Sequence, residues 1–67
     1  MKVSIIGLGY VGSVAAAGFA SDGHDVLGID VSAEKVASYR KGDIPIYEAG
    51  LSELVNEAVS RGNLRFI

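Results

Sequence analysis

Short apolar runs divide the chain into segments that predict strands. Residues 3–6 are almost continuously apolar, which is typical of a parallel strand covered on both faces. Residues 26–29 form a second run of this kind, and residues 64–67 begin a third. Because each run is too short for a helix, the pattern predicts three strands.

Between these runs, apolar residues recur at the spacing of helices. In residues 10–22 a single apolar face is predicted from Val11, Val14, Ala15, Gly18 and Phe19. Gly18 is expected to let this helix approach the sheet closely, and Gly23 to end it. In residues 51–61 the apolar positions follow the i, i+3, i+4, i+7, i+8 pattern up to Gly62: Leu51, Leu54, Val55, Ala58 and Val59.

A further helix is predicted directly after the second strand. Ser32 is a favoured N-cap residue, and Gly42 supplies a stop. Val36 and either Tyr39 or Arg40 are expected on the inner side of this helix.

Strands that alternate with helices in this order predict an α/β fold, β-α-β-α-α-β. A strand, a helix and a strand within about 30 residues form a βαβ unit, whose crossover is right-handed and whose strands are parallel. Residues 43–50 are predicted to be a loop, since Pro45 interrupts any helix there. No repeat or linker is found, so residues 1–67 are expected to form part of one domain, with no second domain.

Composition narrows the class of protein. A chain of 67 residues buries only about 60% of its unfolded surface, so its core is small. A net charge of -2 without a basic run gives no electrostatic basis for binding nucleic acid. The sequence has no cysteine and no apolar run of membrane-spanning length, which leads us to expect a soluble cytoplasmic protein with no membrane partner.

A glycine pattern, G-x-G-x-x-G, follows the first strand and opens the first helix. Gly7 suits a tight turn, Gly9 lets a pyrophosphate approach the backbone, and Gly12 permits close packing of helix on strand. Amides of the first helical turn, around Tyr10 and Val11, lack helical acceptors and favour an anion. This setting predicts a dinucleotide site, and a glycine-rich turn without a ligand is the alternative.

An acidic residue, Asp30, ends the second strand. Its carboxylate can accept hydrogen bonds from the ribose hydroxyls of a dinucleotide and would repel a 2′-phosphate, which favours NAD over NADP. The alternative is a solvated aspartate that starts a turn. Lys35, on the helix that follows, can reach the same ribose or lie free on the surface.

Other polar residues give weaker indications. His24 lies past a helix end without a nucleophile or metal-ligand partner at a suitable spacing, so a structural role is expected. Tyr47 and Glu48 can face a ligand or pack within the loop. No Ser-His-Asp set, metal cluster or cysteine nucleophile can be assembled, so neither a catalytic residue nor a metal site is predicted.

With these motifs together, the chain resembles the N-terminus of the UDP-glucose/GDP-mannose dehydrogenase family. The resemblance runs from end to end and is strongest over residues 1–51. It rests on Gly-x-Gly-Tyr-Val-Gly, on Asp30 with Lys35 five residues later, and on the Ile-Pro-Ile-Tyr-Glu-Ala-Gly-Leu stretch that ends at Leu51. Ala49 stands where the family usually has proline, and the segment from Tyr47 to Leu51 is assigned no ligand.

The resemblance implies the first part of a partial Rossmann fold, a three-stranded parallel sheet with helices on its faces. It implies an enzyme that oxidises the C6 alcohol of a nucleotide sugar to a carboxylate in two NAD-dependent steps. The family's cysteine nucleophile lies far downstream and matches nothing here, so this chain alone is expected to be inactive. Only cofactor binding is carried over: Gly7, Gly9, Tyr10, Val11 and Gly12 to the pyrophosphate, and Asp30 with Lys35 to the adenosine ribose.

Several functions remain open at this point. UDP-glucose is the first expected substrate, on the Ile-Pro-Ile-Tyr-Glu loop. GDP-mannose is second, on Gly-Ser-Val-Ala at residues 12–15 and Gly-Ile-Asp-Val at residues 28–31. The complete enzyme is expected to be a homo-oligomer that binds its nucleotide sugar mainly through residues absent here, with a role in polysaccharide biosynthesis. A stand-alone NAD-binding module and a purely structural piece are the alternatives.

Overall fold

In a computed structural model, the structure describes residues 1–46 and 48–67, so Tyr47 lies outside the described residues. The elements are β1 (Lys2–Ile6), α1 (Tyr10–Ser21), β2 (Asp25–Ile29), α2 (Ala33–Lys41), α3 (Leu51–Arg61) and β3 (Leu64–Phe66). The predicted order β-α-β-α-α-β and the α/β class are therefore confirmed. The described part of residues 43–50 is a loop, as expected.

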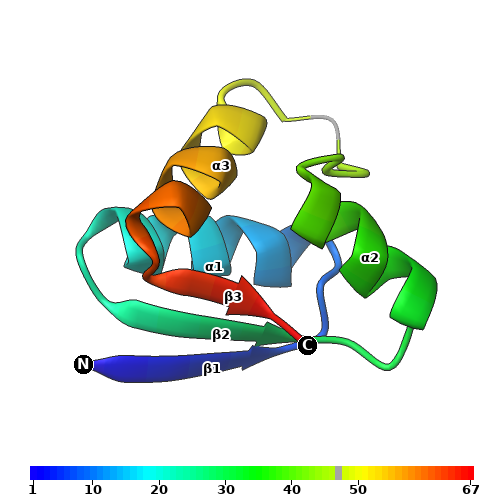
Figure 1. Cartoon of the computed structure of the whole chain (residues 1–67), viewed down its shortest axis with the longest axis horizontal. Helices are drawn as coiled ribbons and strands as arrows, with labels where there is room; N and C mark the ends of the chain where they lie inside the picture. The colour runs from blue at the N-terminus through cyan, green and yellow to red at the C-terminus, as the bar shows by residue number, and fades with distance from the viewer. Residues whose placement is uncertain (47) are drawn as a thin grey trace.

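The strands form one parallel sheet in the order β1-β2-β3 (Figure 1). Val3 lies opposite Val26 in the first pair, and Val26 lies opposite Leu64 in the second. All three helices cover the same face of this sheet in Figure 1. Right-handed crossovers that progress in one direction across a parallel sheet place their helices on one side.

The two faces of the sheet differ in burial. Side chains directed toward the helices belong to the core or pack against it, such as Val3, Val26 and Phe66. On the opposite face Ile6 is 82% exposed. The expectation that β1 is covered on both faces is therefore wrong for this chain, because its described helices all pack on one side.

Helix α1 buries a different face from the one predicted. Its buried residues are Ser13, Ala16, Ala17 and Ala20. Val11, Val14 and Phe19 are exposed instead, and a Cβ added at Gly18 would meet nothing within 4 Å, so Gly18 makes no close approach to the sheet. Because α1 is apolar almost all round, periodicity does not select its inner face. Side-chain size does, since small residues let the helix lie close to β1, β2 and α3.

The predicted helix ends are confirmed. The Ser32 hydroxyl accepts a hydrogen bond from the Lys35 amide at 3.1 Å, which caps α2. Glycines at the predicted stops adopt the left-handed conformation: Gly23, Gly42 and Gly62. On α2, the inner residues are Val36 and Tyr39, and Arg40 is exposed.

Candidate functional site

Helix α1 begins at the carboxyl end of β1 with its first amides open. The chain leaves β1 through Gly7, which has a φ of 94° and donates its N–H to the Ile29 carbonyl at 2.8 Å. Gly9 is the N-cap residue, and no described side chain caps this helix end. The first-turn amides of an α-helix have no acceptor within the helix, and they carry the positive end of its dipole. This end of α1 therefore offers donors to an anion.

Two glycines of the motif have opposite surroundings. A Cβ at Gly12 would lie 1.9 Å from the Gly7 carbonyl oxygen and 3.4 Å from Cγ2 of Ile5, so only glycine fits between helix and strand. A Cβ at Gly9 would meet nothing within 4 Å. Gly12 is thus a packing residue, whereas Gly9 leaves an open approach to the backbone at the helix N-terminus.

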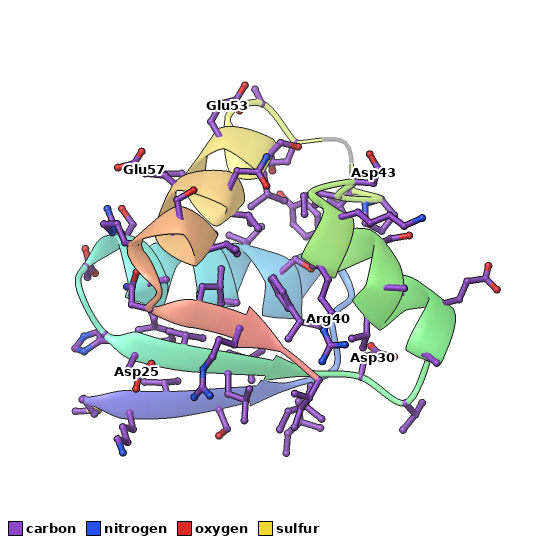
Figure 2. The ribbon with its side chains drawn as sticks, viewed as in Figure 1. Asp25, Asp30, Arg40, Asp43, Glu53 and Glu57 are labelled. Carbon is purple, nitrogen blue, oxygen red and sulfur yellow. The ribbon has the colours of Figure 1, made fainter. Side chains whose placement is uncertain are left out.

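Asp30 lies directly beside this turn. One carboxylate oxygen accepts the Leu8 amide and the other accepts the Ser32 amide, both at 2.8 Å. Figure 2 shows Asp30 at the carboxyl end of the strands, next to α2. An ionised carboxylate has about four lone-pair positions, so two remain for further donors such as ribose hydroxyls. The carboxylate therefore connects the two predicted halves of the site.

The electrostatics keep Asp30 ionised. The hydrogen bond from the Leu8 amide lowers its pKa most, and the Ser32 amide lowers it further; desolvation raises it in part. The charge of Lys35 adds a smaller lowering, since its Nζ lies 3.8 Å from Oδ2 of Asp30. Only 11% of the Asp30 side chain is exposed, against 36% for Lys35. A fixed negative charge at this position disfavours a 2′-phosphate.

A hollow of about 330 Å³ opens beside the Asp30 carboxylate. Its lining residues are Asp30, Val31, Ala33, Val36, Ala37, Arg40 and Ile67. Mostly apolar walls with two charged residues, Asp30 and Arg40, suit a flat, partly apolar ring system attached to a polar sugar. This hollow adjoins the carboxylate that is predicted to bind the ribose, and its mostly apolar lining suits the base of a nucleotide.

The described loop contacts the site at one residue that the sequence did not assign. The Tyr10 hydroxyl donates a hydrogen bond to the Glu48 carboxylate, which joins the first residue of α1 to the segment before α3. This hydrogen bond, with the negative charge of Glu48, raises the pKa of Tyr10. Glu48 is therefore hydrogen-bonded to the first residue of α1 although it is exposed, and Tyr47 lies outside the described residues.

The remaining expectations concern other chemistry. His24 lies edge-on to the Phe19 ring, with 5.9 Å between ring centroids, in keeping with a structural role. Among residues 1–46 and 48–67, no three potential metal ligands form a group. No helix in the same residues has both the length and the apolar character needed to cross a membrane.

The structure thus brings the predicted site residues together at one end of the sheet. They are the motif glycines with Tyr10 and Val11 at the start of α1, and Asp30 with Lys35. Sequence reasoning missed the amides of Leu8 and Ser32, which hold Asp30, because backbone groups leave no sequence signal. These features suit the adenosine diphosphate part of NAD: the uncapped helix end, the open approach at Gly9, and the Asp30 carboxylate held by two amides.

Comparisons with known proteins find matches over almost the whole chain. A model of the "UDP-glucose/GDP-mannose dehydrogenase family, NAD binding domain" matches residues 1–67. A GDP-mannose 6-dehydrogenase of Pseudomonas savastanoi pv. phaseolicola is 48% identical over 65 residues, 97% of this chain and 15% of that protein. A UDP-glucose 6-dehydrogenase of Rhizobium meliloti is 47% identical over 66 residues, 98% of this chain and 15% of that protein.

The chain is also similar to a solved structure. The solved structure of a UDP-glucose dehydrogenase from Pyrobaculum islandicum superimposes with a TM-score of 0.93 and 48% identity, covering 98% of this chain and 15% of that one. The chain therefore spans about 15% of the length of these relatives.

Proposed function

Since the chain belongs to the UDP-glucose/GDP-mannose dehydrogenase family and matches its NAD-binding domain, we propose that it forms the cofactor-binding part of a nucleotide-sugar 6-dehydrogenase. NAD is the cofactor of this domain family. Oxidation of a sugar by the protein is a proposal, because the relatives are far longer than this chain.

One observation supports the site most strongly: Asp30 accepts the amide of Leu8, inside the turn that opens α1. This contact brings the Asp30 carboxylate beside the uncapped end of α1, which supports binding of a ribose and of its pyrophosphate at neighbouring positions. We assign Gly7, Gly9, Tyr10, Val11 and Gly12 to the pyrophosphate. Asp30 binds the adenosine ribose, and Lys35 stands beside it.

The reaction we propose is oxidation of the C6 alcohol of the sugar to a carboxylate, in which one water supplies the second carboxylate oxygen, two NAD are reduced to NADH and three protons are released. When bound, NAD supplies the hydride acceptor. The residues described here bind and orient its adenosine half. No described residue has a chemical role toward a sugar, so we propose that the catalytic groups lie elsewhere in the protein and that this chain alone is inactive.

We propose UDP-glucose as the first substrate, supported by the Ile-Pro-Ile-Tyr-Glu sequence that begins at Ile44. GDP-mannose is the second candidate, supported by residues 12–15 and 28–31. Relatives named for each substrate have almost the same identity to this chain, 47% and 48%. We also propose a cytoplasmic homo-oligomer for the complete protein.

The experiment is a titration of the complete natural protein with NAD and NADP by calorimetry, followed by assay with UDP-glucose and GDP-mannose. We expect NAD to bind at least about tenfold more tightly than NADP, because the 2′-phosphate would meet the Asp30 carboxylate. We expect two NADH per molecule of the preferred sugar nucleotide. No binding of NAD at millimolar concentration would contradict the proposal.

A stand-alone NAD-binding module is the second candidate function. It is favoured by the chemistry of the described site, whose glycines and paired carboxylate are suited to hold a cofactor rather than to react with a sugar. Binding of NAD without turnover of either nucleotide sugar would support it over the enzyme.

A further inference from the structure

A buried tyrosine hydroxyl lies beneath the glycine turn. Tyr39, on α2, is 1% exposed, and its ring packs edge-on against Phe66 with 5.1 Å between centroids. Its hydroxyl donates to the Leu8 carbonyl oxygen at 3.1 Å and hydrogen-bonds to the Ser13 hydroxyl on α1. The Ser13 Oγ also lies 3.3 Å from the Leu8 carbonyl oxygen. Two hydroxyls and one carbonyl therefore form a closed triangle of hydrogen bonds that joins the turn to α1 and α2.

In this triangle one hydroxyl hydrogen is always left to donate to the Leu8 carbonyl oxygen. Each hydroxyl has one hydrogen, and the Leu8 oxygen is acceptor only. Whichever hydroxyl donates to the other, the second hydrogen is free for Leu8. Every buried polar side-chain atom among the described residues has a hydrogen-bond partner, so neither hydroxyl needs a partner outside the triangle.

Both polar groups of Leu8 are thus held from within the protein. Its N–H donates to Asp30 and its C=O accepts from the hydroxyl pair, while its side chain is fully buried. A trans peptide is planar, and its C=O and N–H point in opposite directions. When the Leu8 carbonyl is directed inward, the amide of Gly9 is directed outward, to the open side of the helix N-terminus.

We propose that Tyr39, together with Ser13, is a positioning residue for the cofactor. The pair sets the orientation of the Leu8–Gly9 peptide and thereby aims the Gly9 N–H at the pyrophosphate. The inference rests on the proposed function and adds to it a group on α2 that does not touch the ligand. Because α2 also follows the Ser32 amide that Asp30 accepts, this helix orients both the ribose and the pyrophosphate contacts.

The test compares Tyr39→Phe, Ser13→Ala and the double variant with the unmodified complete protein. Phenylalanine keeps the ring against Phe66 and leaves the Ser13 hydroxyl to donate to Leu8, so Tyr39→Phe should weaken NAD binding about threefold. The double variant leaves the carbonyl without a donor and should weaken it about tenfold or more. Ser38→Ala, which removes a half-buried hydroxyl of the same helix, is the matched control and should leave NAD affinity unchanged.

Adenosine separates positioning from a merely structural role, because it lacks the pyrophosphate. The dissociation constant for adenosine should change less than about twofold in the double variant, and the Gly9 amide resonance should shift in the ligand-free protein. Equal weakening of NAD and adenosine, or unchanged NAD affinity, would overturn the proposal while the unmodified protein still binds NAD. Failure of the unmodified protein to bind NAD would overturn the proposed function and this inference together.

Discussion

The two ends of helix α1 are treated in opposite ways. At its C-terminal end, Nδ2 of Asn63 donates to the Ala20 carbonyl at 2.7 Å and to the His24 carbonyl at 2.9 Å. Nη2 of Arg61 donates to the same Ala20 oxygen at 3.0 Å. At its N-terminal end Gly9 is the N-cap, and no side chain in the described residues accepts from the first amides.

This difference separates the structural end of the helix from the functional one. Both ends of an α-helix leave backbone groups unpaired, and a neutral or cationic donor suits the carbonyl end. At the C-terminus of α1 the side chains of Arg61, at the end of α3, and Asn63, beside β3, supply these donors to the Ala20 carbonyl. The N-terminus is left to water or a ligand, although a serine or aspartate there would cap it. The uncapped amides are suited to bind an anion, and the Asp30 carboxylate beside them is suited to accept hydrogen bonds from hydroxyl groups.

The largest effect is expected at Gly12. Gly12→Ala places a Cβ 1.9 Å from the Gly7 carbonyl, which forces α1 away from β1. We expect a loss of more than about 3 kcal/mol of unfolding free energy, a large part of the stability of so small a chain. Thermal unfolding followed by circular dichroism measures it. Gly9→Ala is the matched control, since its Cβ meets nothing within 4 Å; equal loss in both variants would contradict the packing role of Gly12.

A second variant changes binding rather than stability. Gly9→Val fills the approach to the first-turn amides while meeting no neighbour through its Cβ. We expect NAD affinity to fall by at least about 100-fold, because charge-assisted hydrogen bonds to the pyrophosphate are lost. Calorimetric titration measures this effect, and the melting temperature should stay within about 2 °C. Unchanged affinity would remove the pyrophosphate from this turn.

The opposite behaviour is expected at the other end of α1. Asn63→Ala removes one hydrogen bond to the Ala20 carbonyl in the last turn of α1 and one to the His24 carbonyl just after the helix, and it should cost about 1 to 2 kcal/mol of unfolding free energy. NAD affinity should not change. Denaturant titration and calorimetry together measure both quantities, and a loss of affinity without a loss of stability would reverse the assignment of the two ends.

A smaller effect concerns the choice between cofactors. Asp30→Asn removes the charge that repels a 2′-phosphate, so the ratio of NADP to NAD dissociation constants should fall about tenfold. Using the ratio cancels any general loosening of the turn, which arises because the asparagine side chain has only one acceptor oxygen for the two amides. An unaltered ratio would show that Asp30 does not contact the ribose.

The smallest effect is a pH dependence. The pKa of Asp30 is lower in the folded protein than its ordinary value of 3.8, so the unfolded state binds the proton more readily. This contribution to stability is complete above that ordinary value and is lost as the pH falls through the lowered pKa. Unfolding free energy measured between about pH 5 and about pH 2 should therefore fall more steeply for the unmodified chain than for Asp30→Asn. Parallel profiles would contradict the lowered pKa.

Sequence patterns predicted the elements well where a local signal existed. Ser32 caps α2 and Gly62 ends α3 because each position depends on its immediate neighbours. The inner face of α1 was predicted wrongly, since a helix that is apolar on every side has no periodic signal. Its burial depends on the close approach of β1 and α3, which is a tertiary property.

The same distinction holds for the site. The glycine turn and Asp30 follow from spacing along the chain, and the structure brings them together. Tyr39 and Ser13 contact Leu8 from separate helices, and their distances along the chain have no characteristic value. Asn63 and Arg61 likewise meet α1 only in the folded state. Such contacts are visible only once the elements are packed.

The central claim is that NAD binds at the uncapped end of α1 and not at the capped end. A titration of the ¹⁵N-labelled protein with NAD, followed by amide chemical shifts, tests it directly. The account predicts the largest shifts at residues 8–13 and 30–35, with shifts near zero at residues 20–24 and 61–64. Shifts concentrated at the capped end, or none at millimolar NAD, would contradict it.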